Sequence, residues 1–336
     1  MKKKFKHIIG IDISKNKLDV CLIIDAENKQ HEYFQISNSK ESIALLIKSL
    51  KKYKVETNDS LFCFENTGVY SMHLCYFLQE KKISYSMVPA IEIKRAKGLV
   101  RGKSDKADSL DIALYAITHA HKISCTELPE ADLIELKLLL TERDKLMKAN
   151  ALFDTTKENE NFLPKKLTKQ VFKHNDLTLK FIKSQLARIE KMIANIIKSN
   201  EVIKTQFDLA TSVPGVGQQT AINLIVTTRC FKSFQNWRQL ACYAGVAPFE
   251  YSSGSSIRGK TKVSHMANKK LKSLLNMAAL SAKKHDYEMK KYYERKIAEG
   301  KNGMLVMNAI RCKIISRVFA TVTRGTPFVN TLKYSA

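Results

Sequence analysis

Three short strand-like runs open the chain and limit the folds that it can adopt. His7 to Ser14 alternates apolar and polar positions, and the runs Leu18 to Ile24 and Glu32 to Ile36 follow after short polar breaks. This pattern predicts a three-stranded meander. A further buried strand, Leu61 to Glu65, leads through Asn66-Thr-Gly68 into a helix from Val69 to Glu80. We therefore expect a mixed α/β domain at the N-terminus.

Four carboxylates lie at the ends of these elements. Asp12 ends the first strand, and Glu65 ends the fourth. Asp105 and Asp108 are three residues apart in Lys103-Ser-Asp-Lys-Ala-Asp-Ser-Leu-Asp-Ile-Ala113 and share one face of a predicted helix. Asp111 either continues that face or is a solvated neighbour.

Oxygen ligands of this kind suit a hard divalent cation. Mg²⁺ is usually held by a few carboxylates together with water and substrate phosphates. Two such ions about 4 Å apart can clamp the attacking and leaving oxygens of a phosphodiester. Taken singly, each acid is better explained by a structural role than by a catalytic one. The four acids as a set, in the order strand, strand, helix, predict a metal site.

The middle of the chain is helical. A leucine-rich, charged stretch runs from Ala131 to Leu152, residues 159–166 interrupt it, and a second helix is predicted from Asp176 to Phe207. Apolar residues recur along this helix at alternating steps of four and three, namely Ile182, Leu186, Ile189, Ile193, Ile196 and Ile203, with Asn200 as a polar interruption. We interpret them as a coiled-coil seam for dimerisation, in which Asn200 fixes the register. The alternative is an αα-hairpin within one chain.

A second region of interest begins at Ser212-Val-Pro-Gly-Val-Gly-Gln-Gln-Thr-Ala221. Gly215 and Gly217 form a tight turn into a helix N-terminus, where free N–H groups can take a phosphate; an ordinary turn between helices explains the motif equally well. A helix from Phe234 to Tyr243 follows, and residues 249–259 are rich in serine and glycine, which is typical of a flexible loop. A last amphipathic helix, Gly303 to Phe319, is expected to close the core.

The charge balance indicates a polyanionic partner. The chain has 57 Lys and Arg against 32 Asp and Glu, a formal net charge of +25. Between residues 258 and 296 we count 12 basic and 3 acidic residues. The candidates for phosphate contacts in or near the serine-rich segment are Arg258, Lys260, Lys262, Lys269 and Lys270.

Other sequence features point to a reduced, cytoplasmic protein. Three tyrosines in the basic segment have two possible roles, namely stacking on unpaired bases or packing against the hydrophobic core. The helical spacing of Tyr287, Tyr292 and Tyr293 favours packing against the core. The seven cysteines have no Cys-x-x-Cys spacing and are expected to be reduced core thiols. The sequence has no signal peptide, no apolar run near about 18 residues and no lipidation motif, so we expect no membrane partner.

Three of these motifs resemble a known family. Gly-Ile-Asp-Ile-Ser-Lys at the first strand, Glu-Asn-Thr-Gly at the fourth and Lys-Ser-Asp-Lys-Ala-Asp at the helix are similar, residue by residue, to the DEDD-class bacterial insertion-sequence transposases. That family contains the Piv invertase and the bridge-RNA-guided recombinases, and its first domain resembles the RuvC junction resolvase. The resemblance implies that Asp12, Glu65, Asp105 and Asp108 hold Mg²⁺ or Mn²⁺.

The same resemblance implies a serine nucleophile. The Ala-Gly-x-x-Pro…Ser-Gly frame of the family falls on residues 244–254, which makes Ser253 the nucleophile, with Ser252 as the close alternative and Ser255 or Ser256 less favoured. Strand cleavage would then pass through a covalent phosphoserine linkage to DNA. Two other functions remain open, namely a metal-only endonuclease of the Holliday-junction type and a non-catalytic nucleic-acid-binding scaffold.

Together these inferences give a three-part chain. Residues 1–125 are expected to form a ribonuclease-H-like (RuvC-like) α/β catalytic domain, 126–207 a helical coiled-coil connector, and 208–336 a mainly α transposase domain. The family implies that the protein excises and inserts its own mobile element, with DNA and a guide RNA from the element as partners. We expect a dimer or tetramer, associated with the nucleoid in the bacterial cytoplasm.

Overall fold

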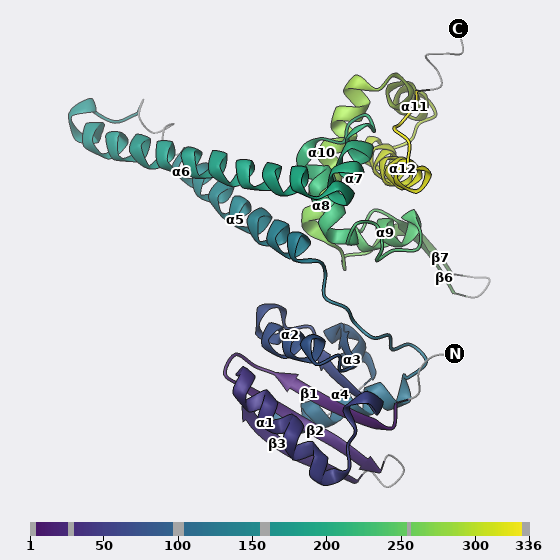
Figure 1. The fold of residues 1–336 in the computed structure, drawn as a ribbon. Helices are drawn as coiled ribbons and strands as arrows, with labels where there is room; N and C mark the ends of the chain where they lie inside the picture. The colour runs from purple at the N-terminus through teal and green to yellow at the C-terminus, as the bar shows by residue number, and fades with distance from the viewer. Residues whose placement is uncertain (1–4, 26–29, 97–103, 155–161, 254–256, 331–336) are drawn as a thin grey trace. The chain divides into compact units, whose positions relative to one another are not determined.

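The computed structural model describes residues 5–25, 30–96, 104–154, 162–253 and 257–330. The chain divides into two compact units, 1–128 and 129–336. Most helices and strands of the two units are labelled in Figure 1.

The N-terminal unit is built on a five-stranded sheet. Its strands are β1 (His7–Ile13), β2 (Lys17–Asp25), β3 (Gln30–Ser37), β4 (Ser60–Glu65) and β5 (Tyr85–Val88), in the spatial order β3-β2-β1-β4-β5. β2 is antiparallel to β1 and β3, whereas β4 is parallel to β1 and β5 is parallel to β4. The predicted meander is confirmed, and a mixed sheet with this order is the ribonuclease-H-like arrangement.

In its described residues, the N-terminal unit also contains four α-helices, which follow or lie between its strands along the chain. They are α1 (Lys40–Leu50), α2 (Met72–Glu80), α3 (Ala90–Ala96) and α4 (Asp105–Thr118), with short 3₁₀ turns at residues 51–53, 57–59 and 68–71. Successive side chains of a strand point to opposite faces of the sheet. On one face Ile9 and Ile11 join the core that α1 and α2 complete, while the other face of β1 meets α4.

A single glycine allows α4 to lie close to β1. A Cβ atom added at Gly10 would lie 2.3 Å from the carbonyl oxygen of Ser109 and 2.5 Å from the backbone nitrogen of Ala113. Ser109 and Ala113 are both fully buried on α4. Three small residues therefore hold the helix backbone against the strand that carries Asp12.

The C-terminal unit is mainly helical. Its helices are α5 (Ala131–Asp154), α6 (Lys165–Ser199), α7 (Glu201–Thr211), α8 (Gln218–Thr228), α9 (Trp237–Tyr243), α10 (Lys269–His285), α11 (Tyr287–Ala298) and α12 (Gly303–Arg324). One core unites α7 to α12, and another joins α5 and α6 to α7 and α8. The expected closing helix, Gly303 to Phe319, is present and extends to Arg324.

The predicted helix from Asp176 to Phe207 is two helices. α6 ends at Ser199, and Asn200 begins α7 as its N-cap, with its side-chain oxygen accepting from the backbone N–H groups of Val202 and Ile203 at 3.1 Å. The Asn200 side chain also donates to Asp132 at 2.7 Å. The register role that we assigned to Asn200 is therefore wrong: the residue satisfies helix-end N–H groups instead.

The apolar residues of α6 pack within the chain. Ile189, Ile193 and Ile197 share a core cluster with leucines of α5, and Arg143 of α5 forms an ion pair with Glu190 at 2.9 Å. Figure 1 shows the two helices side by side. This contact is the αα-hairpin that the sequence left as the alternative.

Residues 249–259, expected to be a loop, belong largely to a β-hairpin. β6 (Pro248–Ser253) pairs antiparallel with β7 (Ile257–Val263), with Pro248 opposite Val263 and Ser253 opposite Ile257. The composition hid the strands, because glycine is depleted in strands and clusters of serine and glycine are typical of flexible loops.

Candidate metal centre and serine hairpin

The first two predicted acids lie on neighbouring strands. Ile11 of β1 pairs with Phe64 of β4 in a parallel register, so Asp12 and Glu65 follow directly on adjacent strands. Asp12 shares the sheet face of Gly10, because side chains alternate along a strand. That face is the one that α4 covers.

The other two acids lie in the first turn of α4. Ser104 is the N-cap, and its side-chain oxygen accepts from the backbone N–H of Ala107 at 3.2 Å. Asp105 and Asp108 then occupy the turn where the helix dipole favours negative charge. The sequence of this turn therefore both starts the helix and places its carboxylates.

The fold brings three of the four acids together. Asp12, Asp105 and Asp108 each offer one carboxylate oxygen, and these oxygens lie within 4.8 Å of one another. Glu65 is not in this group, although its charge acts on Asp12. A set of hard oxygen donors at this separation fits a divalent cation such as Mg²⁺ or Mn²⁺.

The electrostatics of Asp12 point the same way. Burial raises the pKa of the Asp12 carboxyl, and the charges of Asp108, Asp105, Asp19 and Glu65 raise it further. Negative charge is therefore concentrated around Asp12. A bound cation would relieve this repulsion.

Two residues that the sequence analysis missed adjoin the cluster. Asp19 of β2 lies directly opposite Asp12 in the antiparallel register and is 1% exposed. Lys17 places its ammonium nitrogen 2.7 Å from Oδ2 of Asp105 and 3.4 Å from Oδ2 of Asp19. The available signal was a carboxylate inside the apolar run Leu18 to Ile24, because a buried acid requires partners.

Asp19 has such partners. Oδ1 of Asp19 accepts from the hydroxyl of Tyr33 and from Nε2 of Gln35, the latter at 2.8 Å. Burial raises the pKa of Asp19, but these hydrogen bonds and Lys17 outweigh burial, so the pKa lies below its usual value. Both carboxylate oxygens of this buried acid therefore have partners in the chain.

The predicted nucleophile is at the end of β6. The backbones of Ser252 and Ser253 pair with Arg258 and Ile257 of β7. Their side chains, the side chains of Arg258 and Lys260, and residues 254–256 with Ser255 and Ser256 lie outside the described part of the molecule.

The base of this hairpin is fixed by α12. The side-chain nitrogen of Asn308 donates to the carbonyl oxygen of Val246 at 2.6 Å, two residues before β6 begins. Arg311, 6% exposed, donates to Asn308 at 3.4 Å and to Asn276 at 2.5 Å. Burial lowers the pKa of the Arg311 guanidinium.

The two glycines of the predicted phosphate turn differ. Gly215 has φ +92°, and an added Cβ would lie 2.5 Å from the carbonyl oxygen of Ala278 on α10, so packing requires glycine there. Gly217 is the N-cap of α8, has no side-chain cap and has open space around the position of a Cβ. Of the two, only Gly217 leaves room for a ligand at the helix N-terminus.

The remaining candidates are surface cations. Lys262 and Lys269 are exposed, whereas Lys270 pairs with Asp144 of α5. Tyr292 and Tyr293 pack against the core, and Tyr287 is 62% exposed.

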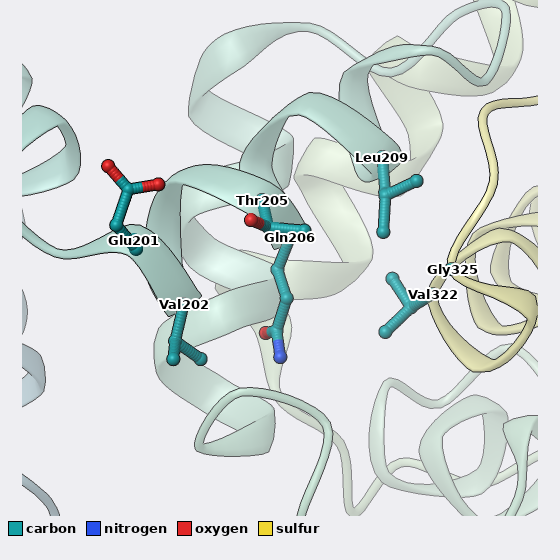
Figure 2. A pocket seen from close by; sticks show the side chains of 7 residues that line it. All are labelled: Glu201, Val202, Thr205, Gln206, Leu209, Val322 and Gly325. Atoms are coloured by element: carbon teal, nitrogen blue, oxygen red, sulfur yellow. The ribbon is translucent and has the colours of Figure 1, made fainter.

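A separate pocket of 360 Å³ lies between α7 and α12 and is lined by residues that include Gln206, Leu209 and Val322 (Figure 2). Glu201 is the one acid of its lining, so this pocket does not supply a metal-binding set.

None of the helices in the described ranges is both long enough and apolar enough to cross a membrane.

The sheet order and the acidic cluster define the class of protein: a ribonuclease-H-like domain joined to a basic helical unit. Family models agree with this class. The IS110-type DEDD model, described as a transposase, matches residues 9–157, and the model of the "Transposase IS116/IS110/IS902 family" matches residues 208–294. The chain belongs to the IS110 family of transposases.

Individual proteins are also similar. The pilin gene-inverting proteins of Moraxella lacunata and Moraxella bovis are each 26% identical over 335 residues, covering 96% of this chain and 98% of theirs. An uncharacterised 43.6 kDa protein of insertion element IS110 from Streptomyces coelicolor is 37% identical over 116 residues, covering 34% of this chain and 28% of its own. Among solved structures, T. thermophilus RuvC in complex with a Holliday junction substrate covers 36% of this chain and 99% of its own, with 14% identity and a TM-score of 0.28.

Proposed function

We propose that this transposase excises and inserts its own mobile element in the bacterial cytoplasm by cutting and rejoining DNA strands. The observation that carries the proposal is the convergence of Asp12, Asp105 and Asp108 from a strand and a helix that lie far apart in the sequence. Family membership and the basic charge of the chain support DNA as the substrate.

In this proposal the four acids are the ligands of a divalent cation. Asp12, Asp105 and Asp108 would hold Mg²⁺ or Mn²⁺ directly, and Glu65 would join them from the neighbouring strand. When bound, the cation supplies stabilisation of the charge that develops on the phosphate oxygens. The contribution of the chain is to fix the carboxylates on a rigid sheet and helix.

Ser253, with Ser252 as the alternative, is proposed as the nucleophile. Its Oγ would form a bond to the phosphorus of the scissile phosphodiester while the bond from phosphorus to one deoxyribose oxygen breaks. The serine proton passes to solvent or a nearby base, and the leaving oxygen is protonated. The reverse attack by a deoxyribose hydroxyl on the phosphoserine releases the serine and rejoins DNA without ATP.

Several groups would bind the DNA backbone. Gly217 leaves the α8 N-terminus open to a phosphate, and the exposed Lys262 and Lys269 lie on and after β7. We include Arg258, Lys260 and Lys270 in this surface on the strength of their positions in the sequence. Gly215 has a packing role in addition to any contact with DNA.

Guidance and assembly are further parts of the proposal. The family resemblance supports a guide RNA that the element encodes, and a dimer or tetramer that pairs the serine of one subunit with the carboxylates of the same or another subunit. The three-part division at residues 125 and 207 belongs to the proposal as well, with α5 and α6 forming most of the connector.

The test is excision in cells that carry the native element. Outward-facing primers detect the circular junction of the excised element for the wild type, Asp12→Asn, Asp108→Asn and the matched control Asp111→Asn, which changes the same charge one turn along α4. We expect the junction to be lost for Asp12→Asn and Asp108→Asn and kept for Asp111→Asn. Loss in all three, or in none at equal protein levels, would refute the assignment of the cluster.

Serine variants in the same assay separate the chemistry. Ser253→Ala, Ser252→Ala and the double variant are compared. Retention of the junction in the double variant would exclude the serine mechanism and leave a metal-only endonuclease of the junction-resolving type. If both Asp12→Asn and the double serine variant formed the excision junction as well as the wild type, neither site would be catalytic. The protein would then be a nucleic-acid-binding scaffold without catalytic activity.

A further inference from the structure

Lys17 is held next to the carboxylate cluster by its own backbone. Ser14 turns the chain between β1 and β2: its side-chain oxygen donates to the carbonyl oxygen of Lys17 at 2.9 Å and accepts from the Lys17 N–H at 3.2 Å. The backbone N–H of Ser14 donates to the same carbonyl at 3.0 Å. These hydrogen bonds fix the backbone from which the Lys17 side chain extends, independently of the contacts of its ammonium group.

The ammonium group then joins two acids from different elements. It lies 2.7 Å from Oδ2 of Asp105 on α4 and 3.4 Å from Oδ2 of the buried Asp19 on β2. Asp19 cannot move freely, because Tyr33 and Gln35 of β3 hold its other oxygen. The Lys17 ammonium group thus contacts the fixed Asp19 of its own strand and reaches Asp105 of α4 from there.

The positions of these acids concentrate negative charge around Asp12. Asp19 stands directly across the strand pair from Asp12, and like charges at opposed positions of a sheet destabilise it. Asp105 and Asp108 add negative charge within 4.8 Å of Asp12. A positive charge from the chain itself offsets part of this repulsion.

We propose that Lys17 is a tethered counter-cation of the carboxylate cluster, which a divalent ion displaces from Asp105 when it binds. The proposal rests on the proposed function, since it takes Asp105 as a metal ligand. An ammonium group in contact with the carboxylate that binds the ion repels that ion, so the two compete for Asp105. Lys17 stabilises the metal-free cluster and weakens metal binding.

Two effects of opposite direction identify this role. Lys17→Met keeps an unbranched side chain but removes the charge, so the metal-free protein should unfold at a lower temperature, while Mn²⁺ binds roughly tenfold more tightly. A lysine that served only to orient Asp105 as a ligand would give the reverse result for the metal, namely weaker binding. Lys17→Arg restores the charge and should bring the affinity back toward the wild type.

The experiment is calorimetric titration of the metal-stripped full chain with Mn²⁺, together with thermal unfolding in EDTA. Lys15→Met is the matched control, because Lys15 is an exposed lysine of the same turn. Tighter Mn²⁺ binding in Lys17→Met and unchanged binding in Lys15→Met would support the proposal. Equal or weaker binding in Lys17→Met would overturn it, and Lys17→Gln provides a second neutral variant if Lys17→Met does not fold.

An additional variant separates this inference from the proposed function. If wild-type binding of Mn²⁺ survives Asp12→Asn unchanged, the cluster is not the metal site, and the proposed function fails with it. If Asp12→Asn abolishes binding while Lys17→Met leaves the affinity as in the wild type, the metal site stands and only the role of Lys17 is refuted.

Discussion

Replacing Gly10 with alanine should separate the two halves of the carboxylate cluster. The added Cβ would lie 2.3 Å from the Ser109 carbonyl oxygen, 2.5 Å from the Ala113 nitrogen and 2.7 Å from the Ala113 Cβ. Comfortable contacts between such atoms are about 3.5 Å, so α4 must retreat by roughly 1 Å. No change of rotamer can relieve the clash, because the opposing atoms are backbone and a Cβ.

The retreat has two measurable costs. Overpacking of this kind lowers the free energy of unfolding by about 1–3 kcal/mol. It also moves Asp105 and Asp108 away from Asp12, which lies two residues beyond Gly10 on the same sheet face. A misplacement of about 1 Å can cost on the order of 100-fold in activity, and we expect Mn²⁺ affinity to fall clearly as well.

Urea unfolding in EDTA and calorimetric titration with Mn²⁺ measure the two costs. Gly217→Ala is the control for stability, because an added Cβ there meets nothing within 4 Å, and its free energy of unfolding should stay within about 1 kcal/mol of the wild type. Wild-type stability and metal affinity in Gly10→Ala would refute the argument that close packing of α4 on β1 assembles the cluster.

Asn200→Ala removes the N-cap of α7 and should cost about 1–2 kcal/mol in urea unfolding; no change would show that the cap is dispensable. Arg317→Met leaves the buried Asp286 without its ion pair and should cost about 3–5 kcal/mol, whereas a smaller loss would indicate that Asp286 finds another partner. The exposed Cys125 should react first with an alkylating reagent, while burial raises the pKa of Cys63 to about 12 and should protect it until unfolding; early labelling of Cys63 in a peptide map would contradict this.

Much of the N-terminal unit could be predicted from local patterns. Alternation of apolar residues placed Asp12 at the end of a strand, and the spacing of Asp105 and Asp108 placed both on one helix face. Period and capping signals are encoded within a few residues of each element. Such local signals can therefore be recognised in a single sequence.

Contacts between distant segments could not be predicted in the same way. Asp19 joins the site only because β2 pairs with β1 in a register that places it opposite Asp12, and Lys17 only because α4 approaches β2. Likewise, the regular apolar spacing of α6 does not distinguish a partner helix in the same chain from one in a second chain. Leucines of α5, such as Leu136, supply the contact in the described structure.

The helix end at Asn200 illustrates a competition between two signals. The apolar period continues past it to Ile203, which favours one long helix, but asparagine is among the strongest N-cap residues. Capping and the bond to Asp132 prevailed. For the serine hairpin, strand pairing overrode a composition that is typical of loops.

The most direct test of the central claim is strand cleavage by purified protein at the carboxylate cluster. Protein would be purified from cells that carry the native element, so that nucleic acid from the element remains bound, and mixed with plasmid DNA that contains the element ends. We predict strand breaks on addition of Mg²⁺ to the wild type and to Asp111→Asn, and none in EDTA or with Asp12→Asn. Breaks formed by Asp12→Asn at the wild-type rate, or undiminished in EDTA, would contradict the account.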